Sequence, residues 1–289
     1  MSNTIELAKS FVPKLDECYR LASLTSVLDG APELAKQGAN ANELIIPMMS
    51  MDGLADYSRN GGYVQGGVTM TNETIKCNFD RGRRFDVDVM DDLETAGLAF
   101  GRLSAQFIRD KVVPELDAFR FASYCGISGV TKKEETLADG AATVAALSAA
   151  VTAMDDEEVT ATGRYLFITP TLLQGINDMD TTKSKKVLEV FERVIKVPQR
   201  RFYTAIKQLS GKTGEEAGGY TKAAGAANIN FAIVQKDALI QYTKHAAPKI
   251  IAPENNPDAD AYVFGYRMVG IAKAYKNMLS GMYFSHDKA

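Results

Sequence analysis

The chain has 289 residues, enough for one large domain or two modest ones, and its composition is that of an ordinary globular protein, 46% hydrophobic and 24% charged. A net charge of -3 gives the chain as a whole no electrostatic attraction to nucleic acid, although it does not exclude a local basic surface. The three cysteines are odd in number and far apart, and neither histidine lies near one, which argues against a disulfide framework and against a zinc site.

The first 41 residues predict a leading arm. Residues 2–29 carry a mild helical pattern that Pro13 interrupts, and they lack the basic flank and apolar core of a signal peptide. Residues 30–42 are rich in Gly, Ala, Asn and Gln, which is typical of a turn or an extended connection. A weak helix on such a tether is either an arm or a surface helix packed on its own domain. No later run approaches the ~20 apolar residues of a membrane span, so we expect synthesis in the cytoplasm and no membrane partner.

Residues 44–89 predict two strands around a glycine-rich tip, NGGYVQGG, at residues 60–67. The return strand has a period of two, with apolar residues at Ile75, Cys77, Phe79, Phe85, Val87 and Val89. This stretch is too long for an ordinary hairpin, whose strands run ~5 to 6 residues, and an isolated ribbon is only marginally stable. We therefore expect the ribbon to pack on neighbouring molecules, which is a first indication of an assembly protein.

Residues 93–123 predict one long helix with a single buried stripe. Its apolar residues recur at steps of three and four, at Leu93, Ala96, Phe100, Leu103, Phe107, Val113, Leu116 and Phe119. Asp91 and Asp92 suit the start of this helix, where carboxylates interact favourably with the free amides and the dipole. Pro114 predicts a kink, or a join between two helices, near Val112 and Val113.

The remaining residues predict a mixture of helices and strands. The expected helices cover 140–154, a segment beginning at Pro170, and 181–196. The expected strands cover 165–169, 197–206, 249–253, 262–271 and 275–284, and a further one begins at 231–234; residues 238–242 continue the fold. Residues 210–228 are low in apolar side chains, which predicts a mobile loop.

Three stretches, taken together and in order, carry a family resemblance. They are MSMDGLADYSRNGGYVQGGVTM running into FDRGRRFDVDVMD, then VVPELDAFRFAS, then IIAPENNPDADAYVFGYR through AYKNMLSGMYF. The chain resembles the tailed-bacteriophage major capsid protein family, which has the Hong Kong 97-like fold. The resemblance covers nearly all of the chain, although residues 130–230 match only in pattern.

The resemblance implies an α+β fold with the parts of that family in their usual order. These are an N-terminal arm at 1–41, an extended β-hairpin loop at 42–89, a spine helix at 91–124 within a peripheral domain formed by 90–159 and 246–289, and an apical domain at 160–245.

The implied function is structural. Copies of the chain would form pentamers and hexamers and close an icosahedral phage head around double-stranded DNA, with only non-specific contact to the DNA. The chain reaches the extended loop by Leu44, which leaves little room for a cleaved scaffolding segment, so we expect a separate scaffolding protein and a portal. A cellular nanocompartment shell of the encapsulin type shares this fold and encloses enzymes instead of a genome, and neighbouring genes for terminase, portal and scaffold would separate the two functions.

The candidate interface residues lie on the ribbon. Arginines at its expected base can pair with carboxylates of another subunit, because their planar guanidinium groups offer several donors, although phosphate binding and a solvated face are the alternatives. The candidates are Arg81, Arg83, Arg84, Gly61, Gly62, Tyr63, Gly66 and Gly67.

A cytosolic metal-dependent enzyme is the rival from another functional class. Its candidate ligands are Asp86, Asp88, Asp91 and Asp92, and Asp258 with Asp260 resembles a calcium turn, but strand alternation, a helix start and Asx-turn chemistry explain these residues as well. Gly211-Lys212-Thr213 lacks the earlier glycine of a phosphate-binding loop, because Ile206 occupies that position. The sequence therefore predicts no catalytic, cofactor-binding or metal-binding residue and no enzymatic activity.

Overall fold

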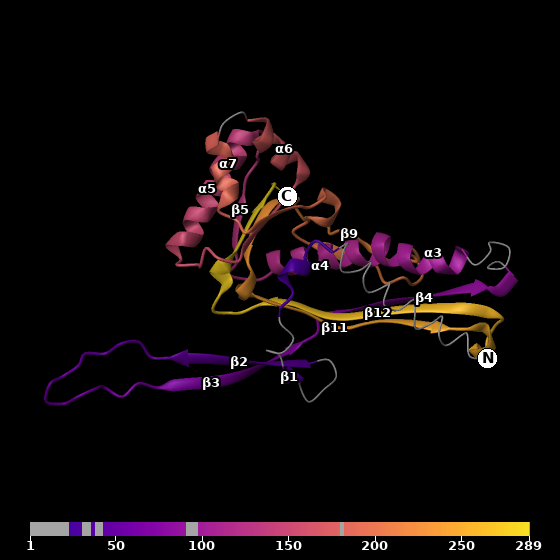
Figure 1. Ribbon diagram of the computed structural model, residues 1–289, viewed down its shortest axis with the longest axis horizontal. Helices are drawn as coiled ribbons and strands as arrows, with labels where there is room; N and C mark the ends of the chain where they lie inside the picture. The colour runs from indigo at the N-terminus through magenta and orange to yellow at the C-terminus, as the bar shows by residue number, and fades with distance from the viewer. Residues whose placement is uncertain (1–22, 31–35, 38–42, 91–97, 180–181, 289) are drawn as a thin grey trace.

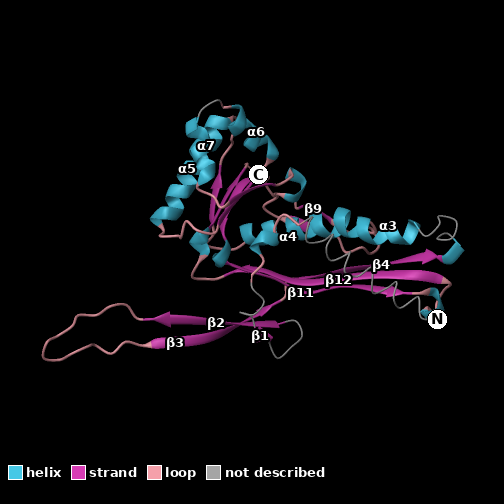
Figure 2. Cartoon of the chain, viewed as in Figure 1, coloured by secondary structure: helices cyan, strands magenta, loops and turns pink. Residues whose placement is uncertain are grey.

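The computed structural model describes residues 23–30, 36–37, 43–90, 98–179 and 182–288. The expected arm lies largely outside these residues; its described parts are a 3-10 turn at Ser26–Leu28 and the short strand β1 at Lys36–Gln37. Strands and helices are both abundant, as Figure 2 shows, so the fold is the expected mixture of α and β. Among the described residues, no helix is long and apolar enough to cross a membrane.

A two-stranded ribbon leaves the rest of the molecule at one end (Figure 1). Its strands β2 (Glu43–Met51) and β3 (Val68–Lys76) pair antiparallel over their whole lengths, and β1 pairs briefly with β2. We call residues 43–76 the ribbon and residues 52–67, between its two strands, the tip. The two expected strands and their glycine-containing tip are confirmed for this segment.

The return strand that the sequence predicts as continuous is two strands in two different sheets. β3 ends at Lys76, and β4 (Phe79–Asp88) joins a long sheet with the order β11-β12-β4, formed with β11 (Leu239–Ile251) and β12 (Ala261–Ala274). Cys77 and Asn78 separate the two strands. The period of two continues through this break, so the apolar alternation alone conceals it.

The long helix runs along one face of this sheet (Figure 1). It comprises α3 (Leu98–Phe107), one π-helical segment (Ile108–Val112) and α4 (Val113–Cys125), which has Pro114 in its first turn. The irregularity predicted from Pro114 is therefore confirmed, because proline at the start of α4 cannot donate the hydrogen bond of a regular helix. Side chains of the helix and the sheet form a core cluster of Phe79, Ile108, Val113, Leu116, Phe264, Tyr266 and Met268.

A five-stranded sheet forms the second part of the molecule. Its order is β5-β13-β10-β6-β7, from β5 (Thr131–Glu134), β13 (Met282–His286), β10 (Ile229–Gln235), β6 (Arg164–Ile168) and β7 (Arg193–Lys196). The helices α5 (Gly140–Asp156), α6 (Pro170–Asp178) and α7 (Thr182–Glu189) pack on one face, and α4 packs on the other through Phe121 and Tyr124.

The sheets do not divide at residue 160, where the sequence places the start of an apical domain. β5, α5 and β13 pack with β6 and β10, although the sequence assigns them to the peripheral part, and β11 crosses the expected boundary at residue 246 within one strand. Hydrogen bonding between strands that are distant in sequence determines this grouping, and local pattern does not reveal it. The two domain assignments remain predictions.

Several local predictions need correction. Residues 197–206 form a 3-10 turn (Gln199–Arg201) and only the beginning of β8 (Ile206–Gln208), not a strand. The helix expected to reach residue 196 ends at Glu189 and is followed by β7. The expected loop at 210–228 contains β9 (Tyr220–Lys222), which pairs with β8 to form a hairpin.

Candidate assembly surfaces

The ribbon exposes an apolar face that nothing in the described chain covers. Antiparallel pairing sets Met49 opposite Met70 and Met51 opposite Val68, so these four side chains share one face. Each of the four is between 57% and 69% exposed. Of the eleven large apolar side chains that are exposed among the described residues, eight belong to the ribbon: Met49, Met51, Leu54, Tyr57, Tyr63, Val64, Val68 and Met70. A patch of this kind is typical of an interaction surface.

The tip is closed by local hydrogen bonds rather than by packing. The Asp52 carboxylate accepts from the Gly67 amide at 2.7 Å, and Ser58 and Gly62 form an isolated bridge. Gly62 has a φ of 73°, a left-handed conformation that glycine adopts more readily than residues with a side chain. The rings of Tyr57 and Tyr63 lie 4.9 Å apart, and Tyr63 is 91% exposed.

The glycines predicted as interface candidates all lie on the tip. The Gly61 amide donates to Ser58 Oγ, and Gly66 and Gly67 lie beside Asp52 where the tip closes. The structure therefore brings Gly61, Gly62, Tyr63, Gly66 and Gly67 together on one exposed projection, while their contact with another subunit stays a prediction.

The root of the ribbon, in contrast, is firmly held. Ile75 is buried in a small cluster with Ile240 and Ile271 of the long sheet. The Asn78 side chain accepts from the Ala272 amide at 3.0 Å and donates to the Ala272 carbonyl at 2.9 Å, so it substitutes for a strand neighbour at the point where the chain changes sheets. These contacts fix the direction in which the ribbon leaves the sheet.

The three candidate arginines lie on β4 and not on the ribbon. Arg81 bonds Glu115 of α4 at 2.8 Å and also donates to the carbonyls of Leu209 and Gly219. Arg83 donates to the Glu216 carbonyl at 2.8 Å. Arg84, on the opposite face of the strand, pairs with Asp86 at 2.8 Å in an exposed setting. Each has a partner within its own chain, and a contact of any of them with another subunit stays a prediction.

The ion pairs around β4 differ in their electrostatics. Burial raises the pKa of the Glu115 carboxyl, and the Arg81 guanidinium opposes part of that shift. On the outer face of the sheet, hydrogen bonds from Arg267 lower the pKa of Asp80. In the loop between β8 and β9, Lys207 and Ser210 lower the pKa of the Glu215 carboxyl to about 2. This loop is organised by hydrogen bonds, although its predicted mobility is untested.

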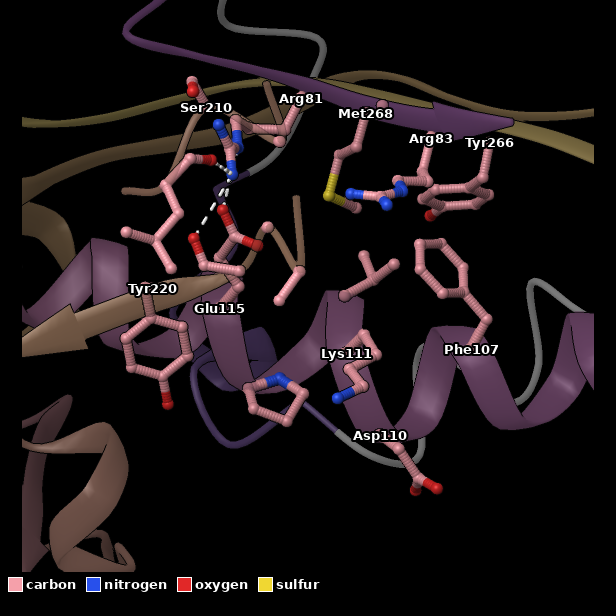
Figure 3. Close-up of a pocket in the computed structure, with 18 of the residues that line it drawn as sticks. Arg81, Arg83, Phe107, Asp110, Lys111, Glu115, Ser210, Tyr220, Tyr266 and Met268 are labelled. Carbon is pink, nitrogen blue, oxygen red and sulfur yellow. Dashed lines mark hydrogen bonds and ion pairs between the residues drawn. The ribbon is translucent and has the colours of Figure 1, made fainter. Parts of the chain in front are cut away.

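A cleft of about 1050 Å³ lies between β4, the long helix and the β8–β9 hairpin (Figure 3). Arg83 lines it from the sheet, above Tyr266 and Met268, which are 5% and 1% exposed and form its buried floor. Phe107 lines it from the helix, and Tyr220 lines it from the hairpin. Lys111, Arg200 and Lys222 also contribute to its lining. We call this the basic cleft; the sequence analysis did not predict it, because its three walls are far apart along the chain.

A second feature that the sequence analysis missed is a buried polar network on α4. Asp117, which has no exposed surface, accepts hydrogen bonds from Ser23, Leu24 and Thr25 and pairs with Arg201 at 3.2 Å. Arg120 is 2% exposed and pairs with Asp29 at 3.1 Å. The network attaches residues 23–30 to the long helix. In the sequence, the network could have been inferred from Asp117 and Arg120, two charged residues three positions apart on an otherwise apolar helix face.

The remaining chemical candidates do not converge on a site. Asp86 and Asp88 lie on β4, Asp258 joins an Asx turn by donating its amide to Asn256 Oδ1, and Asp91 and Asp92 lie outside the described residues. Among the described residues, no three potential metal ligands lie together. Gly211, Lys212 and Thr213 belong to the β8–β9 loop and do not open a helix.

The architecture is similar to that of solved capsid structures. No protein-family model matches the chain, and no curated protein matches it in sequence. A capsid structure of the cyanophage P-SCSP1u has a TM-score of 0.55 at 12% identity, over 88% of this chain and 86% of that chain. A structure from Gordonia phage Cozz has a TM-score of 0.60 at 10% identity, over 93% and 87%. The crystal structure of a virus-like particle from Pyrococcus furiosus has a TM-score of 0.59 at 10% identity, over 96% and 98%.

These similarities concern the fold alone, because the identities are so low. They extend along most of both chains in each pair. The chain therefore has the fold of phage major capsid proteins, and the resemblance found in the sequence is confirmed at that level.

Proposed function

We propose that this chain is the major capsid protein of a tailed bacteriophage, with the Hong Kong 97-like arrangement of arm, extended loop, spine helix, peripheral domain and apical domain. In this proposal the ribbon is the extended loop, and α3, the π segment and α4 form the spine helix. Many copies associate through hexamers and pentamers into an icosahedral shell that encloses double-stranded DNA. The role is structural and includes no catalytic step.

The observation that carries the proposal is the uncovered ribbon in a chain with a capsid fold. Its eight exposed apolar side chains would cost free energy in water, at roughly 25 cal/mol per Å² of apolar surface left uncovered. A two-stranded ribbon also has no second layer of its own to pack on. In the assembled shell, neighbouring subunits supply that layer and cover the apolar face that the ribbon exposes in the isolated subunit.

The other partners follow from the same proposal. A separate scaffolding protein guides assembly, a portal occupies one vertex, and the inner surface contacts DNA without sequence preference. The subunit is synthesised in the host cytoplasm and ends in the virion.

A nanocompartment shell of the encapsulin type is the second candidate. The similarity to the virus-like particle from Pyrococcus furiosus, over nearly the full length of both chains, is the observation that favours it. The two candidates differ in content, since one shell holds DNA and the other holds protein cargo.

Sedimentation and negative-stain microscopy of the purified chain test the proposal. We expect very large particles, either closed shells or curved fragments of them. Replacing residues 61–68 with a short Gly-Ser turn should leave the circular dichroism spectrum native and the sedimentation that of a small species. A wild-type chain that remains a small discrete oligomer at high concentration would contradict a shell function. Nuclease-protected DNA in particles from infected or co-expressing cells separates a phage head from a nanocompartment.

A further inference from the structure

The basic cleft concentrates positive charge in a chain whose net charge is negative. Two carboxylates line it, and each has a basic partner: Glu115 pairs with Arg81, and Asp110 pairs with Arg109. Four further basic side chains line the cleft, all of them exposed, and none pairs with a carboxylate of the described residues: Arg83, Lys111, Arg200 and Lys222.

The four unpaired charges surround the hollow. One comes from β4, one from the π segment of the long helix, one from the 3-10 turn at Gln199–Arg201 and one from β9. Their hydrogen-bond partners are neutral: Arg83 donates to the Glu216 carbonyl at 2.8 Å, and Lys222 donates to Asn228 Oδ1 at 3.0 Å. Neutral partners leave the positive charges uncompensated, so the cleft favours a negatively charged occupant.

The cleft also offers apolar surface between these charges. Tyr266 and Met268 close its floor, as Figure 3 shows, and half-buried side chains form its walls. These wall residues are Leu103, Phe107, Val112, Tyr203, Leu209 and Tyr220. A volume of about 1050 Å³ lies at the top of the roughly 300 to 1,000 Å³ of small-molecule sites, so several side chains of a peptide fit.

Two kinds of anionic macromolecule fit a basic surface, nucleic acid and acidic protein, and the apolar walls favour the second. Duplex DNA keeps its bases stacked inside, so its phosphates are what a sequence-independent basic surface meets, and phosphates gain nothing from apolar walls. An amphipathic helix binds a groove through its apolar face and carries charged side chains beside that face. An acidic helix of this kind matches both the walls and the four charges.

We propose that the basic cleft receives an acidic amphipathic helix of a separate protein, with the apolar face of that helix on Phe107 and Tyr220 and its carboxylates toward Lys111, Arg200 and Lys222. The inference rests on the proposed shell function, in which the separate scaffolding protein is the partner that carries this helix. It adds the site on this chain and the chemistry of the partner's segment. Arg81 takes no part in recognition, because it holds the β8–β9 hairpin within its own subunit.

Fluorescence anisotropy of a labelled peptide tests the site. The probe is a synthetic peptide of ~18 residues, above the length of ~12 to 15 residues below which isolated helices are marginal, with Leu on one face and Glu on the other. It is added to the unassembled subunit at a concentration at which no particles sediment. We expect saturable binding that weakens as salt rises. Two control peptides, one with the same residues in scrambled order and one with Lys in place of Glu, should bind roughly tenfold more weakly or worse.

Charge reversal of the cleft is the matching test on the protein. Lys111→Glu with Arg200→Glu should keep the native circular dichroism spectrum and weaken binding of the probe by roughly tenfold or more, because attraction becomes repulsion. Lys196→Glu with Lys273→Glu changes the net charge equally at exposed positions outside the cleft and should bind as the wild type does. If the reversed cleft unfolds the subunit, Lys111→Gln with Arg200→Gln replaces it and should also weaken binding.

Photo-crosslinking locates the bound probe. A peptide with p-benzoyl-phenylalanine in place of its central Leu should attach to the subunit within residues 103–115 and 200–222, which contain the apolar walls. Attachment confined to other parts of the chain would overturn the cleft as the receiving site.

Four other results would overturn the inference. They are equal binding of the scrambled peptide, unchanged affinity of the reversed cleft, displacement of the probe by a duplex DNA oligonucleotide, which would assign the cleft to nucleic acid, and displacement by unlabelled subunit, which would assign it to a second copy of this chain. Each of them leaves the shell function intact, since none concerns the formation of particles. Failure of the wild-type chain to form large particles would instead be the failure of the proposed function.

Discussion

The strands β3 and β4 are separated by two residues, and they differ in what covers their apolar side chains. On β4, Phe79, Phe85 and Val87 face the long helix and belong to a core cluster. On β3, Val68 and Met70 are 69% and 63% exposed. Both strands alternate polar and apolar residues. This alternation predicts which side chains share a face, but it does not predict whether that face is covered by the same chain or by another.

The same charged substitution on the two regions should have opposite consequences. Phe107→Asp places a carboxylate among the rings of Phe85, Phe264 and Tyr266 and should lower the free energy of unfolding by about 3 to 5 kcal/mol, so that the subunit is insoluble or rapidly proteolysed. Met70→Asp should leave the urea midpoint unchanged and abolish large particles. A soluble, cooperatively folded Phe107→Asp subunit would refute the contrast, as would a Met70→Asp subunit that unfolds.

The buried polar network provides a second comparison, between a buried and an exposed carboxylate on the long helix. Asp117→Ala removes one carboxylate from beside Arg201 and leaves the donors of Ser23 and Thr25 buried without it, so we expect a loss of about 3 kcal/mol in urea unfolding of the subunit. Asp110→Ala, at an exposed position on the same helix, is the control and should change little. Equal effects of the two substitutions would mean that burial of the network does not matter for stability.

Two arginines of β4, Arg81 and Arg84, should likewise differ in how much they contribute to the stability of the subunit. Arg81→Met leaves the Glu115 carboxylate, whose side chain is 12% exposed, without its cation and should cost about 1 to 3 kcal/mol, while Arg84→Met should have no measurable effect. Because the folded-state pKa of Glu115 is raised, its ionisation weakens the folded state as pH rises through that pKa. The loss in Arg81→Met should therefore be larger at pH 7 than at pH 4, and a loss independent of pH would contradict this account.

The smallest expected effect concerns the β8–β9 loop. Glu215 accepts from the Ser210 amide at 2.7 Å, and its pKa of about 2 means that it stays ionised in mild acid. A lowered folded-state pKa stabilises the loop above the ordinary pKa of 4.5, and this contribution is lost as pH falls toward 2. Glu215→Gln should speed hydrogen exchange of the Ser210 amide and proteolysis within residues 209–219 without changing global stability. Unchanged exchange would show that other contacts hold the loop.

Elements with a strong local signal were predictable from the sequence. Pro114 indicated the irregular point of the long helix, and β6 and β10 were recognisable as short apolar runs. The break at Asn78 was not, because a side chain there replaces backbone pairing and the alternation continues past it. The basic cleft was also beyond sequence reasoning, since Arg83, Lys111 and Tyr220 meet only through strand pairing and helix packing. The tip was foreseen because glycine content and length are local properties.

The attachment at Asn78 makes the ribbon a lever. Two hydrogen bonds to Ala272, of 2.9 and 3.0 Å, hold the root, and the paired strands extend about 30 Å from it. A rotation of roughly 10° at the root displaces the far end of such a lever by about 5 Å, given the rise of ~3.4 Å per residue. The Asn78 side chain, together with buried Ile75, therefore sets the direction of the tip, and a small change in geometry at the root is magnified at the far end of the ribbon.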